Sequence, residues 1–260
     1  MSVVDGTLYL THFDAGSGTS QERTFDGSAW SPYHRVGGIS PFPRSAGATI
    51  GASRYSSYVM DNSGQNLYTE ATPGMGEYSQ NADKEAGAPG LAVVGGTLHC
   101  VFRTASWSAG ASRLHHITYT PPASGTPRPQ WSAPMEVPVG RGARDVALVG
   151  LGDTLYCLYR DGGSATLSMA TYKAGTWTAH GQTALVTNST VALAARGGVT
   201  NLGSWVYCFA RSDDGTSLLW AKRSVTGTWP ALQPVPGGGP LATIPAVTWF
   251  KDQLNVFYRH

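Results

Sequence analysis

Short stretches rich in apolar residues alternate with glycine, aspartate, asparagine and proline along the whole chain. Most stretches run for about four to eight residues and are enriched in β-branched and aromatic side chains, which is typical of strands. No segment repeats apolar residues at the helical period over a length that a helix needs. The pattern therefore predicts an all-β protein with many short strands and tight turns.

One of these stretches recurs in closely similar form and ends in arginine each time. Its copies are Thr97–Arg103, Thr154–Arg160 and Trp205–Arg211, with a more distant copy at Gln253–Arg259. The same slot holds Cys100, Cys157 and Cys208, and Val256 in the last copy. A free cysteine packs as a small apolar side chain, and three widely spaced cysteines fit neither a disulfide framework nor a zinc site. We predict three buried thiols.

Each copy is part of a longer unit with an apolar strand before it, a third strand after it, and a fourth strand opened by an aromatic residue. These aromatic residues recur about every 50 residues, at Trp30, Tyr78, Trp131, Trp177 and Trp229. Four short strands per unit, repeated around a ring, are the signature of a β-propeller. We predict one propeller domain over residues 1–260 with five four-stranded blades, in which the repeated aromatics pack between blades.

Closure of the ring allows two registers. In the preferred register, Thr7–Phe13 is a third strand that shares one blade with the C-terminal strands, and residues 16–27 form an insertion. In the other register, Val3–Leu10 forms the first two strands and Ser20–Phe25 the third, so the C-terminal pair starts a sixth, incomplete blade. Five blades are preferred because they leave no unpaired half-blade at the end of the chain.

The charge balance excludes some partners. The chain has 18 Lys and Arg against 16 Asp and Glu, a net charge of +2. Binding to nucleic acid or to an anionic membrane needs clustered basic charge, so neither is expected. The apolar runs are far shorter than a membrane span, and the start of the chain lacks the features of a signal peptide. We expect a soluble protein that is cytoplasmic or released by a non-classical route.

Motifs for catalysis are missing. The sequence contains no Gly-x-Ser-x-Gly elbow, phosphate loop or His-Glu-x-x-His zinc motif. His115 and His116 are adjacent on a predicted strand and point to opposite faces, so one is expected to be exposed and the other packed. Glycoside hydrolysis needs converging carboxylates, yet Asp145 is the only acid beside the innermost strands of blades two to five. We expect no catalytic residue, metal or cofactor.

Arginine and aromatic side chains are the candidates for ligand binding. Arginine ends the second strand of four units, at Arg103, Arg160, Arg211 and Arg259, whereas the second unit has Asp61 there. These guanidinium groups either hydrogen-bond sugar hydroxyls or carboxylates, or tie each blade to its neighbour. The aromatic candidates are Trp107, Trp220 and Tyr68. Trp107 is in a predicted loop, where an exposed indole is costly unless it binds a partner and can stack on the apolar face of a sugar. Trp220 and Tyr68 are on predicted third strands.

The units resemble the repeats of bacterial and fungal β-propeller lectins, best in Phe25–Ser31 and Tyr172–Thr178. The resemblance implies non-catalytic, multivalent binding of glycans or other small neutral ligands at pockets within or between blades. The second unit departs from the pattern at Asp61 and Tyr78, which puts a site there in doubt. Two alternatives stay open. One is an enzyme with a single irregular pocket, built from the 16–27 insertion, Trp107 and the Pro121–Pro129 connection. The other is a platform for protein interactions.

Overall fold

The structure is a computed structural model of the chain. It describes residues 1–14, 19–35, 45–59, 66–72, 75–81, 89–104, 113–120, 131–140, 142–197 and 203–259. All regular structure in these residues is β-strand, and none of them forms a helix that is long and apolar enough to cross a bilayer.

The described strands form six antiparallel sheets, which we number as blades in chain order. Blade 1 contains β1 (Ser2–Val4), β2 (Thr7–Asp14), β3 (Thr19–Phe25) and β4 (His34–Arg35). Blade 2 contains β5 (Ser45–Ile50), β6 (Ser53–Val59), β7 (Asn66–Thr72) and β8 (Met75–Asn81). Blade 3 contains β9 (Gly90–Val94), β10 (Thr97–Arg103), β11 (Leu114–Tyr119) and β12 (Met135–Glu136).

The second half of the chain continues in the same way. Blade 4 contains β13 (Arg144–Leu151), β14 (Thr154–Arg160), β15 (Thr166–Lys173) and β16 (Thr176–Val186). Blade 5 contains β17 (Ala192–Arg196), β18 (Trp205–Arg211), β19 (Leu218–Ser224) and β20 (Gln233–Pro234). Blade 6 has two described strands, β21 (Ala246–Phe250) and β22 (Gln253–Phe257).

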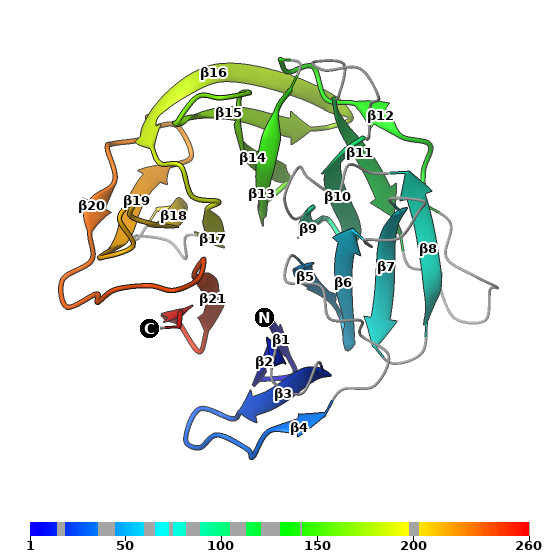
Figure 1. The fold of residues 1–260 in the computed structure, drawn as a ribbon. Helices are drawn as coiled ribbons and strands as arrows, with labels where there is room; N and C mark the ends of the chain where they lie inside the picture. Colours follow the sequence, from blue (N-terminus) through cyan, green and yellow to red (C-terminus); the bar gives the residue numbers. More distant parts are fainter. Residues whose placement is uncertain are drawn as a thin grey trace.

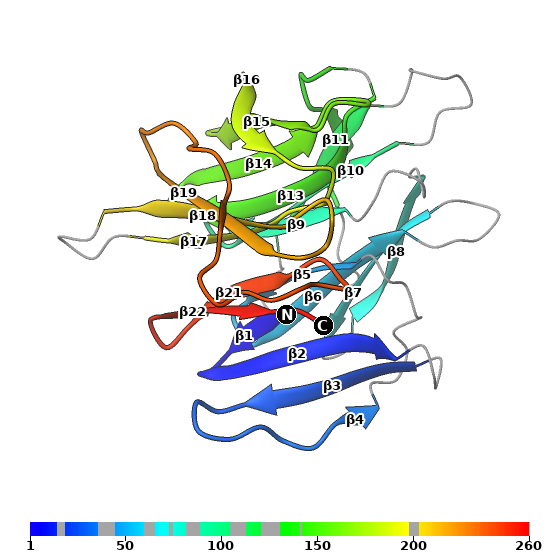
Figure 2. The ribbon, with the colours of Figure 1, turned by 60° about the vertical axis from the view of Figure 1, so that its left-hand side comes forward.

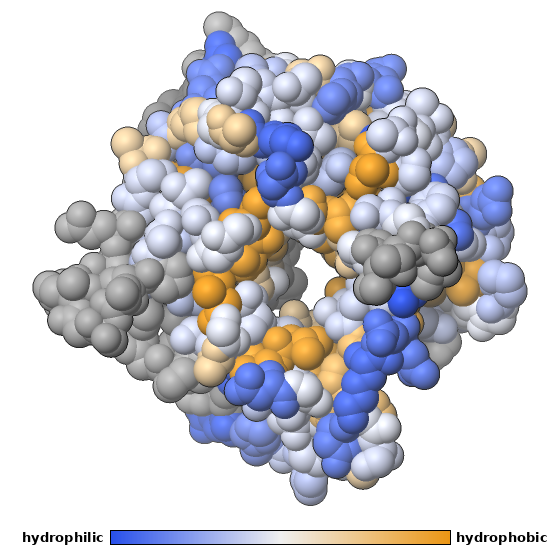
Figure 3. All heavy atoms as spheres, turned by 180° about the vertical axis from the view of Figure 1, so that it is seen from behind, coloured by the Kyte–Doolittle hydropathy of each residue, from blue (hydrophilic) through white to orange (hydrophobic). Residues whose placement is uncertain are grey.

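The first strand of every blade lies on the inside of a ring (Figures 1 and 2). These inner strands contact one another in the order β1, β5, β9, β13, β17, β21, and β21 contacts β1 to close the ring. Blade 1 also covers blade 6, because Trp30 packs edge-on against Phe257 at 5.6 Å and Phe25 lies 5.8 Å from Phe250. Figure 3 shows an opening along the ring axis with apolar residues beside it.

The predicted all-β propeller is confirmed, and several strand ranges agree residue for residue. The second strands of blades 3, 4 and 5 span the predicted residues, and β22 ends two residues before Arg259. The preferred closure with five blades is wrong. β2 pairs with β1 and β3 inside a sheet of its own, and β21 pairs with β22 alone among the described strands. The six-blade register is the one observed, and most of the expected insertion at 16–27 is strand β3.

The reason for this register lies in the first turn. Val4 pairs with Thr7, which leaves Asp5 and Gly6 as a two-residue hairpin loop with φ of 44° and 72°. Both residues are in the left-handed region, as type I′ turns require, and Asp-Gly is a preferred pair for it. This hairpin makes Ser2–Val4 the inner strand, so the N-terminal segment fills the first two positions of a blade.

The core lies between blades rather than within one layer. Four clusters of buried side chains join blades 2 and 3, 3 and 4, 4 and 5, and 5 and 6. Cys100, Cys157 and Cys208 are free and fully buried in three of them, as predicted. Trp131, Trp177 and Trp229 are also buried in these clusters, which agrees with their predicted packing role.

Candidate functional site

The second strands of blades 4 and 5 present corresponding residues to the next blade. Along β14, Tyr156 and Leu158 pack into the cluster shared with blade 5. Along β18, Tyr207 and Phe209 pack into the cluster shared with blade 6. Because side chains two residues apart share a face of a strand, Arg160 and Arg211 extend from these same faces. We call them the blade 4 face and the blade 5 face.

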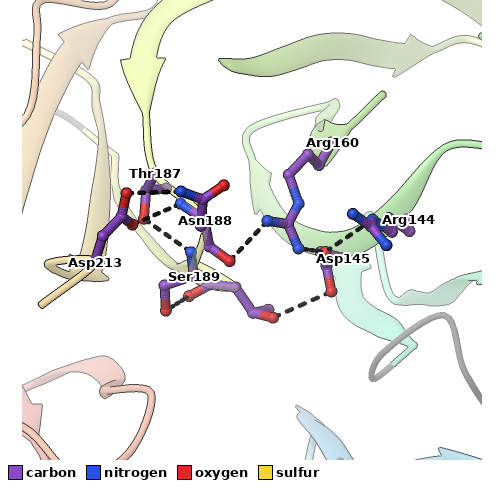
Figure 4. Close-up of polar contacts among 8 residues, drawn as sticks. Arg144, Asp145, Arg160, Thr187, Asn188, Ser189 and Asp213 are labelled. Atoms are coloured by element: carbon purple, nitrogen blue, oxygen red, sulfur yellow. Dashed lines mark hydrogen bonds and ion pairs between the residues drawn. The ribbon is translucent and has the colours of Figure 1, made fainter. Parts of the chain in front are cut away.

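On the blade 4 face, Arg160 is held entirely by the protein (Figure 4). Its Nη2 donates to Oδ2 of Asp145, and its Nη1 donates to the main-chain oxygen of Asn188 at 2.7 Å. The two charged side chains are only 11% and 12% exposed. This guanidinium ties inner strand β13 to the segment that leads into blade 5, which is the structural role considered for these arginines.

A bulge in β13 delivers the carboxylate. Arg144 pairs with Arg160 and Ala147 pairs with Leu158, so β13 has one more residue than β14 between these pairs. Asp145 lies in this bulge with φ of 55°. Bulges re-aim side chains, and aspartate tolerates the left-handed region better than most residues. The local backbone therefore turns the acid toward Arg160.

Neighbouring polar residues complete this arrangement. Thr190 donates to Oδ1 of Asp145 at 3.3 Å. Asn188 is itself fixed by Asp213, which accepts from the Asn188 main-chain nitrogen at 2.8 Å and from Nδ2 at 2.7 Å. Every hydrogen bond in this group is internal to the protein, so the blade 4 face is closed to a ligand at Arg160.

On the blade 5 face, Arg211 is half-buried, and its guanidinium has no hydrogen-bond or ion-pair partner among the described residues, although its main-chain oxygen accepts from Thr187 Oγ1 at 3.4 Å. Its guanidinium lies over the turn after β18, where a Cβ added to Gly215 would be 2.5 Å from Nη2. The ladder between β17 and β18 is regular from Ala192 to Arg196, and the residues that precede it, Ser189 to Val191, include no acid. The Nε of Arg211 is buried, and its two terminal nitrogens have no acceptor among the described residues.

Trp220 shares this face with Arg211. Trp220 is in β19 and pairs with Phe209 of β18, while Arg211 of β18 pairs with Leu218 of β19. Arg211 and Trp220 are therefore diagonal neighbours across the two strands. Trp220 is half-buried and packs against the cluster between blades 5 and 6. The structure thus brings together one predicted arginine and one predicted aromatic residue.

The position of Trp220 is covered in other blades. The corresponding third-strand residues are His116 in blade 3 and Met169 in blade 4. A tryptophan of the next blade donates its indole N–H to each: Trp177 to His116 Nδ1 at 3.3 Å, and Trp229 to Met169 Sδ at 3.4 Å. Blade 6 has no described fourth strand to supply such a residue. Trp220 itself is half-buried.

The other predicted residues are placed as follows. Arg103 ends β10 and is half-buried, with its partner not described. Arg259 is exposed, and its main-chain oxygen accepts from Ala242 at 2.7 Å. The backbone of Tyr68 pairs with that of Tyr58 in blade 2, and the structure places only the backbone of Tyr68. Trp107 and Asp61 lie outside the described residues. The predicted exposed and packed histidines are half-buried His115 and buried His116.

A polar pair that the sequence did not single out lies between blades 1 and 2. Glu22 is buried and accepts from Thr11 Oγ1 at 2.8 Å and from Arg54 Nη1 at 2.5 Å. The Arg54 guanidinium also stacks on Tyr9 at 4.2 Å. Glu22 follows a stretch of small polar residues, so nothing in the local sequence indicates that its carboxylate is buried. In the described part of the chain, no three His, Cys, Asp or Glu residues converge as a metal site.

Comparison with known proteins supports the fold. No protein-family model matches the sequence, and no curated protein matches it. Among solved structures, the chain is similar to the Hadza microbial sialidase Hz136 (TM-score 0.68, 12% identity), covering 99% of this chain and 62% of that one. It is also similar to the fucose-specific lectin from Aleuria aurantia (TM-score 0.67, 12% identity), covering 99% and 86%. A third similar structure is AofleA from Arthrobotrys oligospora (TM-score 0.61, 10% identity), covering 96% and 78%.

These similarities establish the β-propeller fold. One structure of the Aleuria aurantia lectin is described as a six-bladed β-propeller, which agrees with the six sheets here. The chain spans about three-fifths of the sialidase structure's length. At 10–12% identity, the similarity supports the fold and does not identify binding residues in this chain.

Proposed function

We propose that the protein is a non-catalytic carbohydrate-binding propeller. Among the residues that the structure describes, we propose the blade 5 face as the main sugar-binding site. The observation that carries this proposal is the half-buried guanidinium of Arg211, which has no acceptor among the described residues and shares its face with the half-buried indole of Trp220. A guanidinium offers five donors in a planar fork, which suits pairs of sugar hydroxyls. An indole face suits the apolar face of a sugar ring.

The carboxylates favour binding over hydrolysis. Glu22 and Asp145 are the buried acids among the described residues, and each is held by an arginine. Each carboxylate serves an internal ion pair, whereas glycoside hydrolysis uses two carboxyl groups that flank the scissile bond of the substrate. Several solved structures with the same architecture have names that state fucose binding. The low charge of the chain also suits a neutral ligand.

Further sites of lower occupancy belong to the same proposal. Arg103 and Arg259 stand at the sequence position of Arg211 in blades 3 and 6. Two or more weak sites on one ring raise avidity for a multivalent glycan well beyond a single site. Trp107 and Tyr68 remain proposed contributors to such sites.

Glycan-array screening with the purified chain, followed by calorimetric titration of the best binder, tests the proposal. Arg211→Ala is expected to weaken binding at the blade 5 face by about tenfold or more, because a charge-assisted hydrogen bond is lost. Arg35→Ala, which removes an exposed arginine on strand β4, is the matched control for net charge. Failure to bind any glycan overturns the proposal. Equal losses in both variants overturn the assignment of Arg211.

A further inference from the structure

Two histidines form a direct hydrogen bond in the interior between blades 3 and 4. Nδ1 of His99 on β10 lies 2.9 Å from Nε2 of His116 on β11. The rings are nearly coplanar, with an angle of 10° between them, and the residues are 5% and 1% exposed. On the blade 4 side, Trp177 donates its indole N–H to Nδ1 of His116.

These contacts determine which nitrogens carry protons. An indole N–H only donates, so Nδ1 of His116 accepts and its proton lies on Nε2. That Nε2–H then donates to Nδ1 of His99, which is left with its proton on Nε2. The ring of His99 also hydrogen-bonds the main chain of Val94. Both histidines are neutral. The lone pair on Nδ1 of His116 accepts the indole N–H of Trp177, and the lone pair on Nδ1 of His99 accepts the N–H of His116.

Adding a proton therefore breaks the arrangement. A proton on Nδ1 of His116 faces the indole N–H of Trp177, and a proton on Nδ1 of His99 faces the N–H of His116. Both cases set two donors against each other in a buried site. Burial, together with the charge of a protonated His99, lowers the pKa of His116 to about 3. Burial also lowers the pKa of His99.

The surroundings offer no compensating charge. From blade 4, the rings of Tyr172 and Trp177 face the pair, with Tyr172 at 5.6 Å from His99 and 4.7 Å from His116. Cys157 belongs to the same buried cluster, and burial raises the pKa of its thiol, which keeps it neutral. Leu114, Val101 and Val94 complete the apolar lining from blade 3. No carboxylate of the described residues contacts either ring.

We propose that His99, His116 and Trp177 form an acid-sensitive latch that joins blades 3 and 4 when the histidines are neutral and releases the junction when either is protonated. The latch is independent of the sugar site, since it lies at a different blade junction. Because the pair takes up protons only once the junction has opened, acid lowers the free energy needed to open it.

The pH range follows from the direction of the shifts. The unfolded histidines bind protons near pH 6.5, and burial lowers the pKa of both in the folded chain. Their contribution to stability is therefore full above pH 6.5 and declines as pH falls below it. For His116 alone, with values of 6.5 unfolded and about 3 folded, the unfolding equilibrium constant rises about 25-fold between pH 7 and pH 5.

Urea unfolding from pH 7 to pH 5 tests the latch in wild type and in His116→Gln. A glutamine amide accepts from Trp177 and donates to His99 without titrating, so we expect the stability of this variant to fall much less with acid. The double variant H99Y/H116M is a second test, because Tyr156 and Met169 are the natural residues at these positions in blade 4. His180→Gln, which alters an exposed histidine, is the control and keeps the wild-type slope.

Nuclear magnetic resonance of the histidine rings gives a readout that does not depend on the variants folding. We expect Nε2–H tautomers for both buried histidines, no titration of His116 above pH 5, and a slowly exchanging indole proton at Trp177. A wild-type pH slope in both His116→Gln and H99Y/H116M overturns the proposal. So does a buried histidine that titrates near pH 6.5.

Discussion

The blade 4 face and the blade 5 face begin from the same sequence pattern and end in different chemistry. Both have an aromatic residue, an apolar residue and an arginine at alternate positions of the second strand, and both point toward the next blade. The guanidinium of Arg160 donates hydrogen bonds to the Asp145 carboxylate and to the Asn188 carbonyl. The guanidinium of Arg211 has neither kind of acceptor among the described residues.

One extra residue in an inner strand accounts for much of this difference. The bulge at Asp145 places a carboxylate beside Arg160, and the regular register of β17 and β18 provides no equivalent acid. An arginine repeated around a propeller is therefore a structural tie in one blade and a free donor in the next. Repetition alone does not identify a ligand-binding residue.

The largest expected loss of stability comes from breaking the ion pair between Arg160 and Asp145 on the blade 4 face. Asp145→Gly removes the carboxylate and still adopts the positive φ without strain, so it isolates the ion pair from the backbone. Removing one partner of a buried pair leaves an uncompensated charge, and we expect a loss of about 3 kcal/mol in the free energy of unfolding. Urea denaturation measures it.

The open face supplies the control for this prediction. Arg211→Ala removes a guanidinium with no internal partner, and we expect it to change stability by less than about 1 kcal/mol. Similar losses in the two variants would show that the two arginines have the same structural role, and the contrast between the faces would be lost.

Strand pattern and residue type predicted most of the fold and only part of the site. The second strands and buried cysteines followed from a local apolar pattern, because short-range alternation reflects burial directly. The blade count did not, because Thr7–Phe13 fits two strand positions and only the Asp5-Gly6 hairpin decides between them.

The site depended on contacts between residues far apart in the chain. Arg160 and Arg211 are equivalent in sequence, and the bulge that separates them depends on how β13 pairs with β14. The pairing of His99 with His116 depends on the register between β10 and β11 and on a tryptophan 61 residues away from His116. A signal for the bulge was present in Asp145, the single acid beside the inner strands.

A smaller effect separates the turns that follow the two arginines. Gly215 has φ of 74° and lies under Arg211, whereas Gly162 has φ of 52° and open space around it. Alanine at either position costs about 1 kcal/mol of stability, because the left-handed region disfavours a Cβ. Only Gly215→Ala also displaces the guanidinium, so only this variant is expected to weaken sugar binding. Titration calorimetry on both variants checks the difference, and equal affinities would contradict the placement of the ligand at Arg211.

The smallest expected effect concerns the pH response of the turn beneath Arg211. Asp214 accepts from Ser212 Oγ at 2.6 Å and from the Thr216 main-chain nitrogen at 3.0 Å, and these hydrogen bonds lower its pKa to about 2. A lowered carboxyl pKa stabilises the fold above the ordinary value of 3.8, and this contribution is lost as pH falls toward 2. The group is exposed, so we expect the change to be local. The Thr216 amide signal should shift between pH 4 and pH 2 in the wild type and stay fixed in Asp214→Asn. An Asp214 carboxyl that titrates near 3.8 would mean that the turn beside Arg211 does not hold this geometry, and the expected difference between Gly215→Ala and Gly162→Ala would lose its basis.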